Sequence, residues 1–237
     1  MPQLLREQNA GPALRSVRLG PSDCLFQRAS DGTLTLRSPH ALPPYPNNLT
    51  DRLIHWANAA PDRLFMADRG VDGAWRNLTY AEAIAKVRSI GEALLRRNLS
   101  AERPVVVLSG NDLEHQLLAL AAMYVGIPYA PVSPAYSLIS ADFGKLRYII
   151  NLLTPGLVFA SDGSLFSRAI ASTVPHNVER VIARNAVEDR STPFSELVRR
   201  TGGRLVLEKV EGGFRARYFH PLKQIGRANA QMRVSRS

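Results

Sequence analysis

Few side chains of this sequence stand at spacings that support catalysis. Ser109-Gly110 follows an apolar run at residues 104–108, where a nucleophile could stand, but the Gly-x-Ser-x-Gly spacing of a nucleophile elbow is absent. Gly110-Asn111-Asp112 has the position of a dinucleotide-binding turn, yet it lacks the second and third glycines that let a pyrophosphate approach. The plain interpretation of both is a turn between a strand and a helix.

The sequence also contains no pattern of residues that indicates a metal site. His40, His55, His115, His176 and His220 are scattered without the spacing of a metal site. A single cysteine, Cys24, allows no intrachain disulfide and no thiolate cluster, which fits a reducing cytoplasm. We therefore assign no catalytic, cofactor-binding or metal-ligating residue from the sequence.

Three aromatic residues leave two interpretations open. Tyr129, Tyr136 and Phe143 could line an aromatic pocket in a complete enzyme, or they could pack in the core. Core packing is the commoner use of such side chains.

The elements that would position these residues are a strand, a helix and a second strand in about thirty residues. Residues 104–108 form a β-branched, uncharged run typical of a buried parallel strand. Asn111 or Asp112 can cap a helix that Gly126 ends, and residues 127–132 form the next strand. This βαβ unit predicts parallel strands.

The same alternation extends along the chain. Before the unit we predict two β-hairpins, 24–28 with 33–37 and 64–67 with 74–78. We also predict a helix that Thr50 caps, that extends through Ala60 and that buries Trp56, and a helix at 80–97 with a Thr79/Glu82 capping box. After it we predict helices at 142–153 and 164–172, strands at 157–160 and 178–183, a helix start at 193–199, and a further hairpin from 204–208 and 214–219. An edge strand at 17–19 is also expected. The fold class is α/β, a parallel βαβ sheet layered with helices and preceded by β-hairpins.

The distribution of charge and of apolar residues argues against nucleic-acid binding by the domain, secretion and a membrane span. The net charge is +10, and residues 204–237 contain eight basic residues against Glu208 and Glu211, so the excess belongs to that end of the chain. This distribution argues against a specific nucleic-acid surface on the domain. The N-terminus lacks the apolar stretch of a signal peptide, and the apolar run at 117–127 is too short to span a bilayer.

Two motifs resemble those of the adenylate-forming (AMP-binding) superfamily, which includes acyl-CoA synthetases and luciferases. They are AMYVGIPYAPV at residues 122–132 and LTYAEA at residues 78–83. The following SPAYSL at 133–138 and DFGKL at 142–146 are similar to feruloyl-CoA synthases in particular. The resemblance extends over roughly residues 15–200.

This resemblance implies a truncated N-terminal subdomain of the acyl-CoA synthetase fold, and ATP, Mg²⁺ and CoA as ligands of the complete enzyme. A Ser/Thr/Gly-rich phosphate loop ending in Pro-Lys and a lysine on a C-terminal lid would be required. Thr201-Gly202 is the only Thr-Gly pair, and no Pro-Lys follows it. We therefore expect an acid–CoA ligase fragment that is inactive alone and binds none of these ligands unaided.

The expected organisation is a disordered N-terminus at 1–16, a partial synthetase domain at 17–200 and a basic tail without family likeness at 201–237. A shift of reading frame near Arg200 would explain why the tail does not resemble the family. Two alternatives stay open. The chain could be a non-catalytic module completed by a downstream partner chain that supplies the missing ligase portion, or the tail could bind polyanions.

Overall fold

A computed structural model of the chain describes residues 20, 23–46, 48–187, 191–199, 204–210 and 213–219. The predicted disordered N-terminus at 1–16, the edge strand at 17–19 and residues 220–237 lie outside this description. The chain divides into two compact units, residues 1–45 and 46–237.

Unit 1 contains the first predicted hairpin. Strands β1 (Leu25–Arg28) and β2 (Leu34–Arg37) are antiparallel, with Phe26 opposite Leu36. Gly32 has a φ of 87°, and the Asp31 carboxylate accepts a hydrogen bond from the Thr33 amide at 2.9 Å. The Asp-Gly turn therefore forms as predicted. All residues from 23 to 45 are exposed.

Unit 2 begins with helix α1 (Thr50–Ala59), hairpin β3 (Leu64–Arg69) and β4 (Trp75–Thr79), and helix α2 (Tyr80–Leu95). The Thr79/Glu82 capping box is present. Two expectations for α1 were wrong. Thr50 is the first helical residue and Leu49 precedes it in a helical conformation, so Thr50 does not cap. Trp56 is 37% exposed, whereas α1 packs on the core through the buried Leu53, with Ile54 and Ala57 partly buried beside it.

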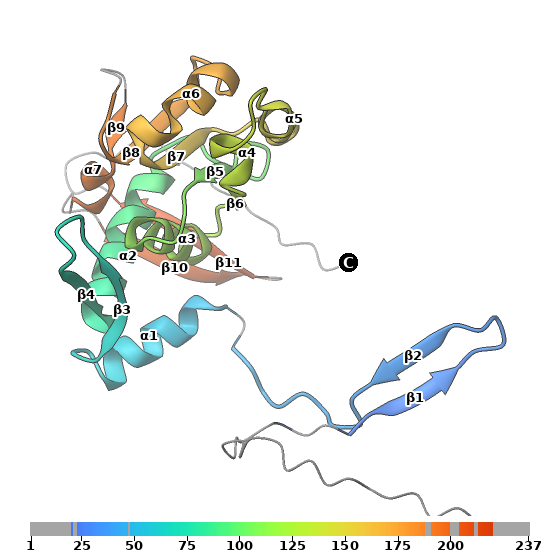
Figure 1. Ribbon diagram of the computed structural model, residues 1–237. Coiled ribbons are helices and arrows are strands. Elements are labelled where there is room, and N and C mark those ends of the chain that lie inside the picture. Colours follow the sequence, from blue (N-terminus) through green and yellow to red (C-terminus); the bar gives the residue numbers. More distant parts are fainter. Residues whose placement is uncertain are drawn as a thin grey trace, which may run out of the picture. The chain divides into compact units, whose positions relative to one another are not determined.

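A five-stranded parallel sheet forms the centre of unit 2 (Figure 1), and its strand order is β6-β5-β7-β8-β9. Its strands are β5 (Val105–Leu108), β6 (Tyr129–Val132), β7 (Leu157–Asp162), β8 (Glu179–Arg184) and β9 (Thr192–Pro193). The intervening helices are α3 (Leu113–Val125), α4 (Ala135–Leu138), α5 (Gly144–Leu153) and α6 (Gly163–Thr173), and α7 (Phe194–Val198) follows β9. The predicted α/β class and the parallel βαβ unit are confirmed.

Alternation along the strands divides the core into two apolar clusters. Val105, Val107 and Phe159 face the first cluster with α2, α3 and α7. Val106, Leu108 and Val158 face the second cluster with α5 and α6. Helices therefore cover both faces of the sheet, as its fully buried strands require.

Some boundaries differ from the prediction for local reasons. The strand expected from 127 starts at Tyr129, because the Ile127 amide still donates to Ala122 O at 2.9 Å behind the left-handed Gly126. The helix expected from 142 starts at Gly144, because Phe143 has a φ of 54° and the Asp142 carboxylate accepts a hydrogen bond from the Gly144 amide at 3.1 Å. The short helix α4 was not predicted.

The predicted C-terminal hairpin is confirmed. Strands β10 (Arg204–Val210) and β11 (Gly213–Phe219) are antiparallel, with Leu207 opposite Ala216. We call these two strands the ribbon. Its Ala216 belongs to the first apolar cluster.

Candidate functional site

The topology of the parallel sheet marks one edge as the candidate site. β5 lies between β6 and β7, and the helix after β5 packs on the first cluster while the helix after β7 packs on the second. Connections that diverge in this way leave a crevice outside the carboxyl ends of the strands, which is where doubly wound sheets bind ligands. The turn after β5 at 109–112 and the junction of β7 with α6 at 162–163 therefore border the candidate position.

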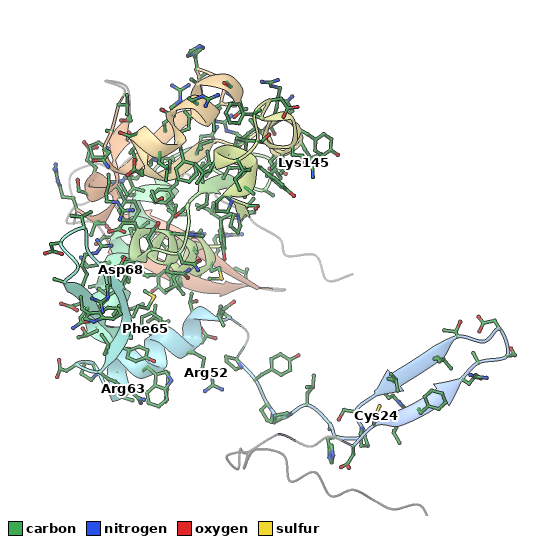
Figure 2. All side chains as sticks on the ribbon, viewed as in Figure 1. Cys24, Arg52, Arg63, Phe65, Asp68 and Lys145 are labelled. Atoms are coloured by element: carbon green, nitrogen blue, oxygen red, sulfur yellow. The ribbon has the colours of Figure 1, made fainter. Side chains whose placement is uncertain are left out.

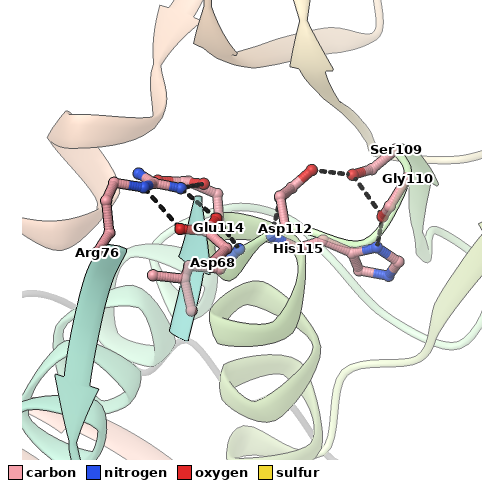
Figure 3. Close-up of polar contacts among 8 residues, drawn as sticks. Asp68, Arg76, Ser109, Gly110, Asp112, Glu114 and His115 are labelled. Carbon is pink, nitrogen blue, oxygen red and sulfur yellow. Dashed lines mark hydrogen bonds and ion pairs between the residues drawn. The ribbon is translucent and has the colours of Figure 1, made fainter. Parts of the chain in front are cut away.

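The turn after β5 satisfies its own polar groups. The Asp112 carboxylate accepts hydrogen bonds from the Ser109 hydroxyl and, at 2.8 Å, from the His115 amide. His115 Nδ1 lies 2.9 Å from Gly110 O (Figure 3). Ser109 is 5% exposed, and its hydroxyl is hydrogen-bonded to Asp112 rather than to a histidine. The arrangement is that of a helix cap, not of an activated nucleophile.

Beside this turn, Arg76 of β4 bridges two carboxylates from different elements. Its Nε donates to Asp68 of β3 at 2.8 Å, and its Nη1 and Nη2 donate to Glu114 of α3 at 2.7 and 3.1 Å (Figure 3). Asp68 also accepts from the Leu113 amide at 3.3 Å. We call Asp68, Arg76 and Glu114 the carboxylate clamp. It fastens the β3–β4 hairpin to the start of α3.

The clamp shifts the pKa values of its members. Hydrogen bonding by Arg76 lowers the pKa of Asp68 below its ordinary value. Burial is the largest single influence on Glu114 and raises its pKa, but the hydrogen bonds from Arg76, a backbone hydrogen bond and the attraction of Arg76 and Arg184 together outweigh it, so the pKa of Glu114 is also lowered. The two carboxylates raise the pKa of Arg76, with Glu114 contributing most. All three groups are therefore charged at neutral pH.

This charge pattern decides what the turn can bind. Three carboxylates, those of Asp68, Asp112 and Glu114, lie at the start of α3, and two of them occupy backbone amides there. A helix start that binds phosphate needs free amides and no competing negative charge. The turn at 110–112 is therefore unsuited to the pyrophosphate of a dinucleotide or of ATP.

The junction of β7 with α6 is closely packed against the end of β8. The Asp162 carboxylate accepts from the Leu165 amide at 3.0 Å and from Asn185 Nδ2 at 2.7 Å. A Cβ on Gly163 would lie 2.4 Å from Asn185 O, and Asn185 itself has a φ of 51°. Only glycine fits at position 163 without displacing the backbone of 185.

Two cations lie on aromatic rings where α4, α5 and α6 meet. Lys145 Nζ is 5.3 Å from the centre of the Tyr136 ring, and Arg168 Cζ is 5.8 Å from that of Phe143. Both cations are exposed (Lys145 is labelled in Figure 2), and neither forms an ion pair with a carboxylate in the described ranges. We call these four residues the cationic cluster. Cations without carboxylate partners, backed by aromatic rings, suit an anionic ligand.

The three aromatic residues of the sequence analysis do not gather in one place. Tyr129 packs against the first apolar cluster, whereas Tyr136 and Phe143 lie in or against the second, on the other face of the sheet. Phe143 is 6% exposed and so serves the core.

The histidines have separate local roles. His40 lies 3.0 Å from Asp23 in unit 1, and the His55 ring meets Trp56 edge-on at 5.1 Å. His220 is outside the described residues. Within the described part of the chain, no three His, Cys, Asp or Glu residues could hold a metal ion together, and no helix there has the length and apolar character to cross a membrane.

Sequence reasoning missed both the clamp and the cationic cluster. Arg76 and Glu114 are 38 residues apart and follow no local spacing. Lys145 and Arg168 lie on different helices. One feature of the sequence could have indicated the cationic cluster. Residues 163–178 contain no Asp or Glu, so Arg168 has no carboxylate on its own helix with which to form an ion pair.

Comparisons with known proteins agree with this architecture. The profile of the AMP-binding enzyme family matches residues 53–209, which includes all of β10 except Val210, whereas the resemblance in sequence was expected to stop near residue 200. Luciferin 4-monooxygenase of Photinus pyralis is 30% identical over 89 residues, 38% of this chain and 15% of that protein.

Two solved structures share the fold. A protein designated long-chain-fatty-acid CoA ligase from Rhodopseudomonas palustris matches with a TM-score of 0.51 and 22% identity, over 63% of this chain and 36% of its own. The luciferase-like enzyme from the mealworm Zophobas morio matches with a TM-score of 0.51 and 16% identity, over 66% of this chain and 36% of its own. The chain thus spans about a third of the length of these structures.

The family match extends over more than half of the sequence and contains the whole parallel sheet together with the cationic cluster and the clamp. This chain belongs to the AMP-binding enzyme family.

Proposed function

We propose that this chain is the N-terminal part of an ATP-dependent acid–CoA ligase similar to feruloyl-CoA synthases. The observation that carries the proposal is the family match over residues 53–209 together with the parallel sheet. The motifs at 122–132, 133–138 and 142–146 support the feruloyl-CoA synthase subfamily.

The proposed reaction has two steps. A carboxylate oxygen of the acid attacks the α-phosphorus of ATP, which releases pyrophosphate and forms an acyl-adenylate. The thiol of CoA then attacks the acyl carbon, which releases AMP and forms the thioester. Each step requires groups that hold phosphates and their charge.

The residues present fit only part of these requirements. The start of α3 does not fit the ATP phosphates, because Asp68, Asp112 and Glu114 surround it. The cationic cluster fits an anionic group, and in the proposed ligase it would bind a phosphate of CoA through Lys145 and Arg168. The sequence contains no Ser/Thr/Gly-rich loop with Pro-Lys, so we propose that the 237-residue chain does not form the adenylate unaided.

An ATP–pyrophosphate exchange assay with ferulate and related cinnamic acids tests the proposal. The purified chain is expected to give no exchange. Adding a polypeptide with the missing phosphate loop and lid, taken from a feruloyl-CoA synthase, is expected to restore exchange. Robust exchange by the chain alone would refute the proposed inactivity, and failure of every complemented mixture to adenylate an acid would count against the ligase.

A partner chain that supplies the missing portion is the second candidate, in which this chain is a non-catalytic module. It is favoured by strand β6, which pairs only with β5 among the described strands, and by exposed apolar side chains on α4, directly after α4 and on α5. These side chains are Leu138, Ile139, Tyr148 and Leu152. Co-purification with a chain that contains the loop and lid would support this candidate, whereas a stable, monodisperse monomer would argue against it.

A further inference from the structure

Helices α5 and α6 form the outer layer on one side of the parallel sheet. Their inner sides pack on the second apolar cluster, through Leu146 and Ile150 of α5 and Phe166 of α6. The two helices lie side by side (Figure 1), and Arg147 Nη2 of α5 donates to Ser172 O of α6 at 3.3 Å. Their outer sides therefore share one surface, which we call the outer face.

The outer face carries positive charge. Neither α5 nor α6 contains Asp or Glu, whereas α1, α2, α3 and α7 each have an acidic residue in the first turn. Lys145, Arg147 and Arg168 are exposed on this face. Asp142 lies two residues before α5 and Asp162 directly before α6, and each carboxylate accepts a backbone amide at a helix start. The acidic groups thus lie at the edge of the outer face, where the helices begin.

Large apolar side chains accompany these cations. Lys145, Tyr148 and Leu152 follow one another on α5 at spacings of four or fewer residues and so lie along one stripe of the helix. Tyr148 is 67% exposed, Leu152 is 65% exposed, and Leu165 of α6 is 60% exposed. Ile139 is 81% exposed directly after α4, which contacts both helices. Most of the surface of each of these apolar side chains is therefore open to solvent beside a basic residue or beside the same two helices.

Basic and apolar side chains on the same side of a helix suit the surface of an anionic membrane. The apolar side chains enter the boundary between headgroups and acyl chains, and the long basic side chains keep their charged ends at the lipid phosphates. Tyrosine fits the same boundary, because its ring is apolar and its hydroxyl is polar. Anionic lipids attract each nearby Lys or Arg, and no carboxylate within α5 or α6 opposes that attraction.

We propose that the outer face docks unit 2 on an anionic lipid surface, with Tyr148, Leu152 and Leu165 among the headgroups. An acidic protein is the competing occupant. It would need a surface fitted to several separate projecting side chains, whereas a fluid lipid surface accommodates them in any arrangement. The proposal depends on the outer face alone and goes beyond the ligase proposal.

Sedimentation of the purified full chain with lipid vesicles tests the proposal. Vesicles of one part phosphatidylserine to three parts phosphatidylcholine are compared with vesicles of phosphatidylcholine alone. We expect the chain to sediment with the anionic vesicles and much less with the neutral ones, and we expect added salt to weaken this binding. No ATP, acid or CoA is present, so the result is independent of any failure in the ATP–pyrophosphate exchange assay.

Paired variants locate the binding surface. Tyr148→Ser together with Leu152→Ser removes two exposed apolar side chains and no charge, and it should weaken binding to the anionic vesicles at least tenfold. The matched control is Leu64→Ser together with Val71→Ser, which removes two exposed apolar side chains from the β3–β4 hairpin and should leave binding unchanged. All variants keep residues 220–237, whose basic residues attract anionic vesicles equally in each.

A second pair tests the charge. Arg147→Glu should weaken binding at least fivefold more than Arg52→Glu, which makes the same change of net charge on α1. Absence of sedimentation with the anionic vesicles would refute the proposal and leave the outer face to a protein partner. Equal effects within either pair of variants would also overturn it, because binding would then follow the net charge of the chain and not the outer face.

Discussion

Arg97 donates two hydrogen bonds to Glu179, from Nε at 2.7 Å and from Nη2 at 2.8 Å, although 82 residues separate them in the chain. Arg97 follows α2 and Glu179 is the first residue of β8, so the pair joins the end of α2 to the start of β8. Thr192 of β9 donates to the same carboxylate at 3.0 Å. One carboxylate thus holds three segments together.

Glu179→Gln is expected to destabilise the chain by about 1–2 kcal/mol, because it weakens charge-assisted hydrogen bonds that are only partly screened by solvent. Urea unfolding followed by circular dichroism measures this loss. The control is Glu196→Gln, an exposed glutamate in the first turn of α7. Equal midpoints for the two variants would contradict the structural role of the pair.

The carboxylate clamp predicts a dependence of stability on pH. The pKa values of Asp68 and Glu114 lie below their ordinary values of 3.8 and 4.5. Groups with a lowered pKa in the folded state stabilise it fully above the ordinary value and lose that effect as pH falls through the folded pKa. The free energy of unfolding should therefore fall as pH drops below about 4.5, and Arg76→Met should flatten this fall.

At neutral pH the same Arg76→Met variant leaves two carboxylates without their cation. Because the Arg76 side chain is 38% exposed, solvent limits the expected loss to about 1–2 kcal/mol. Arg52→Met, on an exposed position of α1, is the control. A pH profile of the Arg76 variant parallel to that of the unmodified chain would be incompatible with the clamp.

Gly163→Ala is expected to destabilise unit 2 by about 1–3 kcal/mol, because the new Cβ would collide with the backbone of Asn185. Gly110→Ala is the matched control, since nothing lies within 4 Å of a Cβ there. Thermal unfolding of both variants measures the difference. Similar melting temperatures would show that the end of β8 yields to the methyl group.

The sequence predicts that the chain alone does not bind CoA, whereas the cationic cluster predicts charge-dependent binding of CoA by the purified chain. Lys145→Glu and Arg168→Glu together should weaken CoA binding at least tenfold, since they replace two cations by anions at the proposed phosphate position. Calorimetric titration of the purified chain with CoA measures the affinity. Arg52→Glu, which reverses a charge on α1, should leave the affinity unchanged, and an equal effect of all the variants would indicate nonspecific attraction.

Much of the local structure follows from short stretches. The Asp31-Gly32 turn, the Thr79/Glu82 capping box and the helix from Asp112 to Gly126 were all predicted, because each depends on side chains within a few residues of one another. The α1 prediction failed at Trp56 for the opposite reason. How far that ring is buried depends on which neighbours the fold brings to α1, and spacing along the helix does not contain this information.

The sequence by itself determined the element types, the parallel βαβ unit and the resemblance to the AMP-binding enzymes, since hydrophobic periodicity and turn residues act locally. Only the tertiary structure decided that Arg76 joins Asp68 to Glu114, that Lys145 and Arg168 lie on aromatic rings, and that Ala216 is buried beside α2. The physical reason is that each of these contacts joins segments far apart in the chain, and it forms only after the sheet order and the two covered faces have been established.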